Sequence, residues 1–199
     1  DFTNSVLKNV DFTDADLTRV ILTGVDLTGS NLTNASLPGV VSGNIIGHPD
    51  HLPLGWKIIK KYLVGTHANL TNADFTDADF TDAVLTGVHL LGANLNNVKS
   101  KNVTGSLTGN NPTQLPSDWN IINGYLVGPN ANLTGADFTN ADLSNVNLTG
   151  ATLTDSTLTN VKSGGIKGTG VKLPHQWQLI NGFLVGPQAD LTGARFNGE

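Results

Sequence analysis

A large apolar residue recurs at every fifth position through much of this chain. Between positions 131 and 158 these central residues are Leu133, Phe138, Leu143, Leu148, Leu153 and Leu158. The sequence has 22 such centres, and the 21 with a residue two places upstream all have Ala, Val or Ser there. A period of five fits neither the 3.6-residue period of a helix nor the two-residue period of a strand. It predicts a chain that turns a corner between centres, with the small residue also inside because a larger one would overpack the interior.

Composition excludes several classes of protein. Charged residues make up 14% of the 199 residues, the net charge is -5 and cysteine is absent. Without a basic stripe we expect no direct nucleic-acid binding, and without cysteine no disulfide framework. No apolar run approaches the roughly 18 residues of a membrane span. The low charge and the richness in Thr, Asn and Gly favour an extracellular or cell-envelope location, with a cytoplasmic one as the alternative. A repeat already in register at Asp1 suggests a piece of a longer protein.

The five-residue units resemble the pentapeptide-repeat family, whose consensus is A(D/N)LXX. Matching units are ADFTD at 73–77, ANLTG at 131–135 and ADFTN at 136–140. The resemblance implies an all-β fold, a right-handed quadrilateral parallel β-helix in which four units make one coil. Successive coils would then stack about 4.8 Å apart through backbone ladders.

The repeat register predicts one elongated β-helix over 1–199, built from the runs 1–52, 70–115, 133–173 and 191–196. The runs that begin at 1, 70 and 133 each continue through one unit with a serine centre and then one with a glycine centre. The serine centres are Ser42, Ser100 and Ser163. We expect an altered coil at these units, narrowed or bulged to admit a side chain from outside. Neither end shows a capping helix, and an exposed β-edge favours end-to-end self-association.

Three related motifs, at 53–69, 116–132 and 174–190, interrupt the rhythm. Their aromatic residues are Trp56, Tyr62, Trp119, Tyr125, Trp177 and Phe183. The Asn-Gly pairs at 123–124 and 181–182 lie between apolar runs and predict two-residue hairpins, whereas Lys60-Lys61 fits poorly and suggests a different turn in the first copy. A coil shortened from 20 to 18 residues is the alternative. One face of such a hairpin can pack on the β-helix, and the other must be covered by the Ser- and Gly-centred units, by a loop such as 106–114 or by a partner. We interpret the aromatic residues as a structural clamp, with a ligand-binding patch as the alternative.

Aspartates form the second candidate site. They cluster at Asp74, Asp77, Asp79 and Asp82. The resemblance includes fluoroquinolone-resistance proteins that mimic DNA and bind type II topoisomerases such as gyrase, and acidic corners would suit that role. A calcium site is a further possibility, while local hydrogen bonds to corner backbone would explain the same residues.

Threonine follows the centre in 16 of the 22 units, which would suit an ice- or glycan-binding ladder. Its spread over all faces favours an ordinary β-surface instead. His48, Asp50 and His51 have a metal-like spacing, but the other motifs lack them, so we interpret this segment as a surface loop. No Ser/His/Asp grouping, phosphate-binding loop or pair of buried carboxylates appears in the sequence. We therefore predict a non-catalytic scaffold without cofactor or metal that binds an unknown protein partner.

Overall fold

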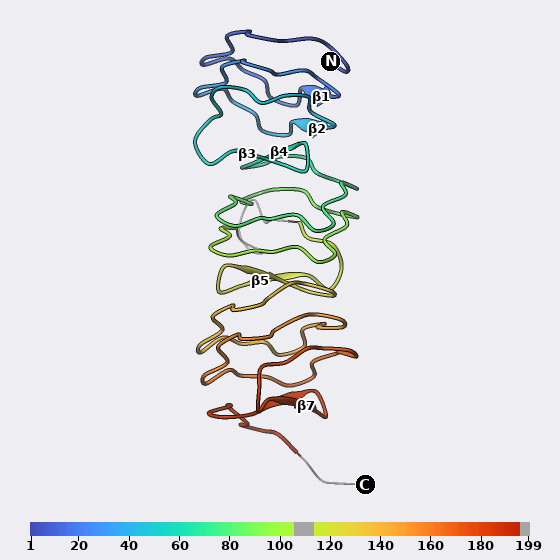
Figure 1. The fold of residues 1–199 in the computed structure, drawn as a ribbon, viewed down its shortest axis with the longest axis vertical. Coiled ribbons are helices and arrows are strands. Elements are labelled where there is room, and N and C mark those ends of the chain that lie inside the picture. The colour runs from blue at the N-terminus through green and yellow to red at the C-terminus, as the bar shows by residue number, and fades with distance from the viewer. Residues whose placement is uncertain (106–113, 196–199) are drawn as a thin grey trace. The chain divides into compact units, whose positions relative to one another are not determined.

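The computed structural model describes residues 1–105 and 114–195, where every regular element is a β-strand. The chain divides into two compact units, and Figure 1 traces the backbone with its colour running by residue number. The first comprises Asp1–Ala78, Asp82–Asn94 and Thr104–Ser117, and the second Asp79–Thr81, Leu95–Val103 and Asp118–Glu199. Within the described ranges we find no helix long and apolar enough to cross a membrane.

Within each unit the backbone pairs with itself at a spacing of 20 residues. In the first unit Val6 pairs in parallel with Asp26 and Asp26 with Ile46, and in the second Asn132 pairs with Thr152. A pair of backbone hydrogen bonds forms each step. For example, the N–H of Leu27 donates to the carbonyl of Ile46 (3.0 Å), and the N–H of Ile46 donates to the carbonyl of Val25 (2.8 Å). Twenty residues are four five-residue units, so four units make one coil. The ladder lengthens to three pairs where β1 (Ile21–Thr23) meets β2 (Val41–Gly43).

The central and small positions form the core. Phe75, Phe80 and Phe138 are fully buried, and Ala136, two places before Phe138, is 2% exposed. The narrow interior therefore alternates a large and a small side chain, which is how interdigitating layers reach native packing density. The pairing of 26 with 46 and of 147 with 167 continues this register into the units beyond Ser42 and beyond Leu158, as the sequence predicts.

The corners are tight turns, and many of them have a local hydrogen bond from a backbone N–H to a side chain. The N–H of Ala141 donates to the carbonyl of Phe138 (2.9 Å), and Asn140, between them, has a φ of 58°. Asn, Asp and Gly tolerate this left-handed conformation better than other residues. Asp137 Oδ1 accepts a hydrogen bond from the N–H of Thr139 (2.9 Å). The recurring Asp/Asn-x-Thr string is therefore a corner-forming turn.

The three Trp motifs each contain a pair of antiparallel strands. The pairs are β3 (Lys57–Ile59) with β4 (Tyr62–Val64), β5 (Asn120–Ile122) with β6 (Tyr125–Val127), and β7 (Gln178–Ile180) with β8 (Phe183–Val185). The turns are 60–61, 123–124 and 181–182. Lys60 and Lys61 have φ values of 49° and 65°, close to the 49° and 78° of Asn123 and Gly124. The expectation that the first turn differs is wrong: register imposes the same turn despite the unsuitable residues.

The ladder skips extra residues where it passes a hairpin. Val41 pairs with Asn69, and Lys162 with Asp190, in each case 28 residues apart and eight more than the regular spacing. The hairpins 57–64 and 178–185 are eight residues long. Residues 106–113 and 196–199 lie outside the described ranges, and with them most of the loop expected to cover a hairpin and the centre at position 196.

Candidate functional site

A buried serine hydroxyl fastens each hairpin to the coil. The Oγ atoms of Ser42, Ser100 and Ser163 accept hydrogen bonds from the backbone N–H groups of Leu63, Leu126 and Leu184, at 2.9, 2.8 and 3.0 Å. In a two-residue hairpin alternate N–H groups point away from the partner strand, so each of these leucines needs an outside acceptor. The central Leu of the ordinary units cannot supply one, which explains why the centre is Ser here.

Each tryptophan packs on a glycine of the same motif. The rings of Trp56, Trp119 and Trp177 lie against Gly65, Gly128 and Gly186, where an added Cβ would overlap the indole atoms. Trp119 is only 9% exposed. The tryptophans thus contact the residue that directly follows the second strand of their own hairpins.

The other aromatic residues of the motifs also have intramolecular partners. Tyr62 packs on Phe75 with ring centroids 5.0 Å apart, and Tyr125 on Phe138 at 5.3 Å. The hydroxyl of Tyr125 accepts a hydrogen bond from the N–H of Asp137 (3.1 Å). Phe183 lies beside Gly164, whose Cβ would be 3.1 Å from its ring. Tilted aromatic pairs of this kind stabilise the fold beyond simple burial.

The acidic residues hold corners together. Asp74 accepts hydrogen bonds from the hydroxyl and N–H of Thr76, which lower the pKa of that carboxyl, and Asp79 accepts one from the N–H of Thr81 (2.8 Å). Asp77 and Asp82 occupy left-handed turn positions with φ values of 60° and 57°.

Elsewhere the carboxylates pair with cations on the next coil. Lys162 Nζ lies 3.1 Å from Asp142 Oδ2, and this contact, after hydrogen bonds from Ser144, lowers the pKa of Asp142 to about 2. Lys8 Nζ lies 3.2 Å from Asp26 Oδ2. The outer columns therefore alternate in charge at these places.

Several threonine hydroxyls are engaged by the same turns. The hydroxyls of Thr28, Thr33 and Thr76 donate to the preceding Asp26, Asn31 and Asp74, at 2.6, 2.6 and 2.7 Å. The hydroxyl protons of these threonines are thus directed at protein oxygen atoms.

The segment from His48 to His51 is exposed apart from a half-buried Pro49. In the described part of the chain no three His, Cys, Asp or Glu side chains converge on a point that could hold a metal ion.

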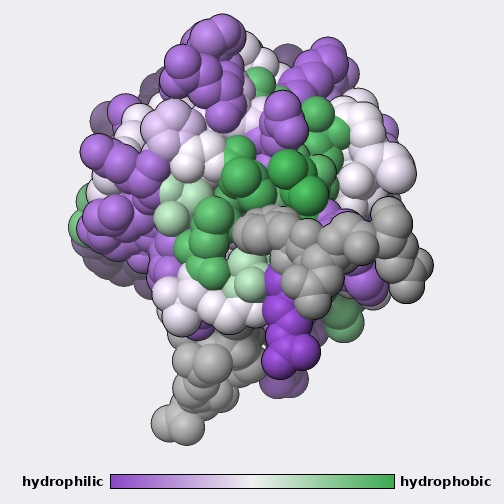
Figure 2. Space-filling model, turned by 90° about the horizontal axis from the view of Figure 1, so that it is seen from below, coloured by the Kyte–Doolittle hydropathy of each residue, from purple (hydrophilic) through white to green (hydrophobic). Residues whose placement is uncertain are grey.

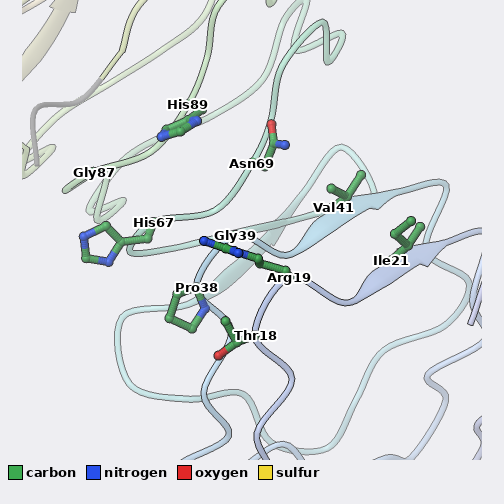
Figure 3. A pocket seen from close by; sticks show the side chains of 10 residues that line it. All are labelled: Thr18, Arg19, Ile21, Pro38, Gly39, Val41, His67, Asn69, Gly87 and His89. Atoms are coloured by element: carbon green, nitrogen blue, oxygen red, sulfur yellow. The ribbon is translucent and has the colours of Figure 1, made fainter. Parts of the chain in front are cut away.

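A hollow of about 720 Å³ opens on the first unit. Figure 3 shows its lining, with His67 and His89 on one side and Ile21 and Val41 on the other. The remaining lining residues are Thr18, Arg19, Pro38, Gly39, Asn69 and Gly87. The lining contains two histidines and an arginine and no carboxylate, although the chain as a whole is acidic.

A second hollow, of about 410 Å³, opens on the second unit. It contains Lys99 and Asn132, which pair across the second hairpin as Val41 and Asn69 pair across the first. The rest of its lining is Asp79, Thr81, Ser100, Lys101, Tyr125, Thr134 and Gly135. Among the aromatic and acidic residues singled out from the sequence, Tyr125 and Asp79 line it.

Sequence reasoning missed Arg19. The residue two places after each of the 22 centres is Asn, Asp or Gly in 21 cases, and Arg19 is the exception. Comparison of that turn position across the units would have found it. Its contact with the hollow could not have been predicted, because it depends on which coils the hairpin brings together.

Apolar side chains are exposed in the middle of one face, which Figure 2 shows ringed by hydrophilic residues. In the second unit, β6 is buried along its length, whereas Phe183 and Val185 of β8 are half-buried and Ile180 of β7 is 37% exposed. The predicted end-to-end self-association would use surfaces of this kind, and it stays a prediction.

Comparison with known proteins places the chain by its repeats. A family model described as pentapeptide repeats matches eight copies over residues 1–39, 66–99 and 130–162. No curated protein matches the chain.

Among solved structures the chain is similar to HetL, a pentapeptide repeat protein involved in heterocyst differentiation regulation from the cyanobacterium Nostoc sp. strain PCC 7120. Identity is 19%, the match covers 97% of this chain and 90% of HetL, and the TM-score is 0.28. It is also similar to QnrB1, a plasmid-mediated fluoroquinolone resistance protein, at 13% identity, 93% and 90% coverage and a TM-score of 0.27. Because the family model matches more than half of its residues, the chain belongs to the pentapeptide-repeat family, whose fold is the right-handed quadrilateral β-helix.

Proposed function

We propose that this protein is a non-catalytic scaffold that binds a protein partner through the hollows beside its hairpins. The observation that carries the proposal is the recurrence of the hollows. Each contains the two residues that pair across a hairpin, Val41 with Asn69 and Lys99 with Asn132. A generic coil would not be expected to repeat such a feature at the same structural step.

The hairpins, in this proposal, are eight-residue insertions that reshape one face of the coil. Their tryptophans and tyrosines contact their own hairpin or the coil beside it. This supports the clamp interpretation of the aromatic motif, and it leaves the surfaces beside the hairpins as the place for a partner. Repeat proteins commonly bind partners through such extended surfaces.

The two alternative functions receive less support from the geometry. DNA mimicry needs rows of available negative charge, but Asp74 and Asp79 bind their own turns and Asp142 faces Lys162. A threonine ladder needs hydroxyls directed at solvent, but those of Thr28 and Thr76 donate to aspartates. Inhibition of gyrase supercoiling at micromolar protein, or thermal hysteresis, would favour the respective alternative over a scaffold.

The experiment uses the full chain as bait for a lysate of the native organism, with three matched variants. Thr18→Trp fills the first hollow and Thr134→Trp the second, and both keep the backbone N–H bonds to Asp16 and Asn132. Thr169→Trp is the control, an exposed threonine outside both hollows.

We expect at least one captured protein to form a complex with the purified wild type and the control, and to lose at least about tenfold in affinity for one hollow-filled variant. A captured set that binds all four proteins equally, or that forms no complex when purified, would refute the proposal.

A further inference from the structure

We infer that the first hollow binds an extended acidic peptide segment, of about four residues, in which carboxylates alternate with apolar side chains. The inference rests on the proposed scaffold function and names the chemistry of the partner. Three features of the hollow carry it: its length, the presence of Arg19 between a side with two imidazole rings and an apolar side, and the way Arg19 and His67 are held.

The length of the hollow fits a short extended chain. Its lining comes from four successive levels of the stack, at 18–21, 38–41, 67–69 and 87–89. Parallel strands lie about 4.8 Å apart, so the three steps between these levels span about 14 Å. An extended peptide advances about 3.3 Å per residue, so about four residues fill the hollow.

The two sides of the hollow differ in chemistry. His67 and His89 lie on one side with Arg19 between the sides, while Ile21 and Val41 lie on the other (Figure 3). Side chains of an extended peptide alternate in direction. A segment that alternates acidic and apolar residues would therefore direct its carboxylates to Arg19 and the N–H groups of the imidazole rings, and its apolar groups to Ile21 and Val41.

Arg19 is available to such a ligand. Within residues 1–105 and 114–195 no carboxylate lies in ion-pair contact with its guanidinium. Asp16 is close in sequence, but one of its oxygens accepts the N–H of Thr18 at 3.0 Å. A guanidinium can bind a carboxylate through two parallel hydrogen bonds, which gives both strength and orientation.

Arg19 and His67 are held in place by glycines of the next coil. The Cγ of Arg19 lies 3.0 Å from where a Cβ of Gly39 would stand, and the ring of His67 lies where a Cβ of Gly87 would be. Both residues have left-handed backbone, with φ values of 58° and 60°. Most repeat units have Asn, Asp or Gly in this conformation, and an arginine adopts it at a cost. Strained residues of this kind cluster at functional sites.

The test is an NMR titration of the ¹⁵N-labelled full chain with blocked tetrapeptides. The probe is acetyl-Asp-Leu-Asp-Leu-amide, and the controls are the Asn-Leu-Asn-Leu and Asp-Gly-Asp-Gly peptides and inorganic phosphate. We expect the probe to shift the amide signals of Gly39 and Gly87 saturably, and both control peptides to bind at least about tenfold more weakly because they lack the charge-assisted bonds or the apolar contacts.

Three variants locate the binding. Arg19→Gln should weaken probe binding at least about tenfold. Gly39→Asn adds a side chain that suits φ 72° but lies where Arg19 packs, and should abolish it. Gly170→Asn, at φ 68° with open space around it, is the matched control and should bind as the wild type does. The dispersion of each spectrum reports whether the variant is folded.

Four results would overturn the inference. The first is the absence of a saturable shift up to about 5 mM probe, which would place the Kd above the low millimolar range. The others are equal binding of the asparagine peptide, equal probe binding by Arg19→Gln, and the same shifts with phosphate alone, which would indicate a single-oxyanion site. If the probe fails while a captured partner still depends on Thr18→Trp or Thr134→Trp, the scaffold function stands and only the acidic-peptide inference is wrong. If no partner depends on either hollow while the probe binds, the scaffold proposal is the one that fails.

Discussion

Replacement of the serine that anchors a hairpin should destabilise the protein far more than loss of an oxygen atom suggests. In Ser100→Ala the N–H of Leu126 loses its acceptor, which lies 2.8 Å away. Leu126 is 0% exposed, so water cannot replace the hydroxyl without opening the core. A buried N–H left without a partner costs about 1–3 kcal/mol. We expect the free energy of unfolding to fall by about 2 kcal/mol.

A second buried serine provides the matched control. Ser156 is 8% exposed against 7% for Ser100, and its hydroxyl has no hydrogen-bond partner among the residues that the structure describes. Burial of an unpaired hydroxyl is itself unfavourable, so Ser156→Ala should be neutral or should stabilise by up to about 1 kcal/mol. Urea denaturation followed by far-ultraviolet circular dichroism measures both changes. Equal effects of the two substitutions would refute the anchoring role of the serine hydroxyl.

Three further predictions concern the hairpins and the corners. Gly128→Ala places a methyl group where the Trp119 indole lies and should lower the free energy of unfolding by about 2–3 kcal/mol. Gly170→Ala, which adds backbone strain alone, should lower it by about 1 kcal/mol. Urea denaturation measures both changes, and equal changes would contradict the ring contact. Lys61→Gly removes the strain of a lysine with left-handed backbone in the first turn. It should stabilise the protein by about 0.5–1 kcal/mol after the entropy cost of glycine is subtracted. A fall in the melting temperature would contradict this prediction. Because the pKa of Asp142 is lowered to about 2 in the folded chain, its contribution to stability is complete above the unfolded value of about 4 and is lost as pH falls towards 2; urea midpoints should therefore drop over that window, and less steeply in Asp142→Asn.

The five-residue rhythm determined the core by itself. The inward positions and the persistence of the register through Ser42 follow from a period that neither helix nor strand can satisfy, whereas the four-unit coil was implied by the resemblance to the pentapeptide-repeat family. The Asn-Gly pairs likewise indicated two-residue turns, because the residues that tolerate positive φ are few. These features are local or strictly periodic, so one sequence is enough to predict them.

Tertiary structure decided which coils meet at a hairpin, and with that the candidate site. The ladder step from Val41 to Asn69 skips eight extra residues, so His67 falls into one column with Arg19 and Gly39. Arg19 and Gly39 are connected by the regular 20-residue spacing, but no fixed spacing connects Gly39 to His67. The same step brings the N–H of Leu63 to the hydroxyl of Ser42, which accepts its hydrogen bond. This hydrogen bond explains why the centre of that unit is a serine. The first turn shows this influence most directly: Lys60 and Lys61 adopt the conformation that the surrounding register requires, against their own preference, because the packing of two strands outweighs the strain of two residues.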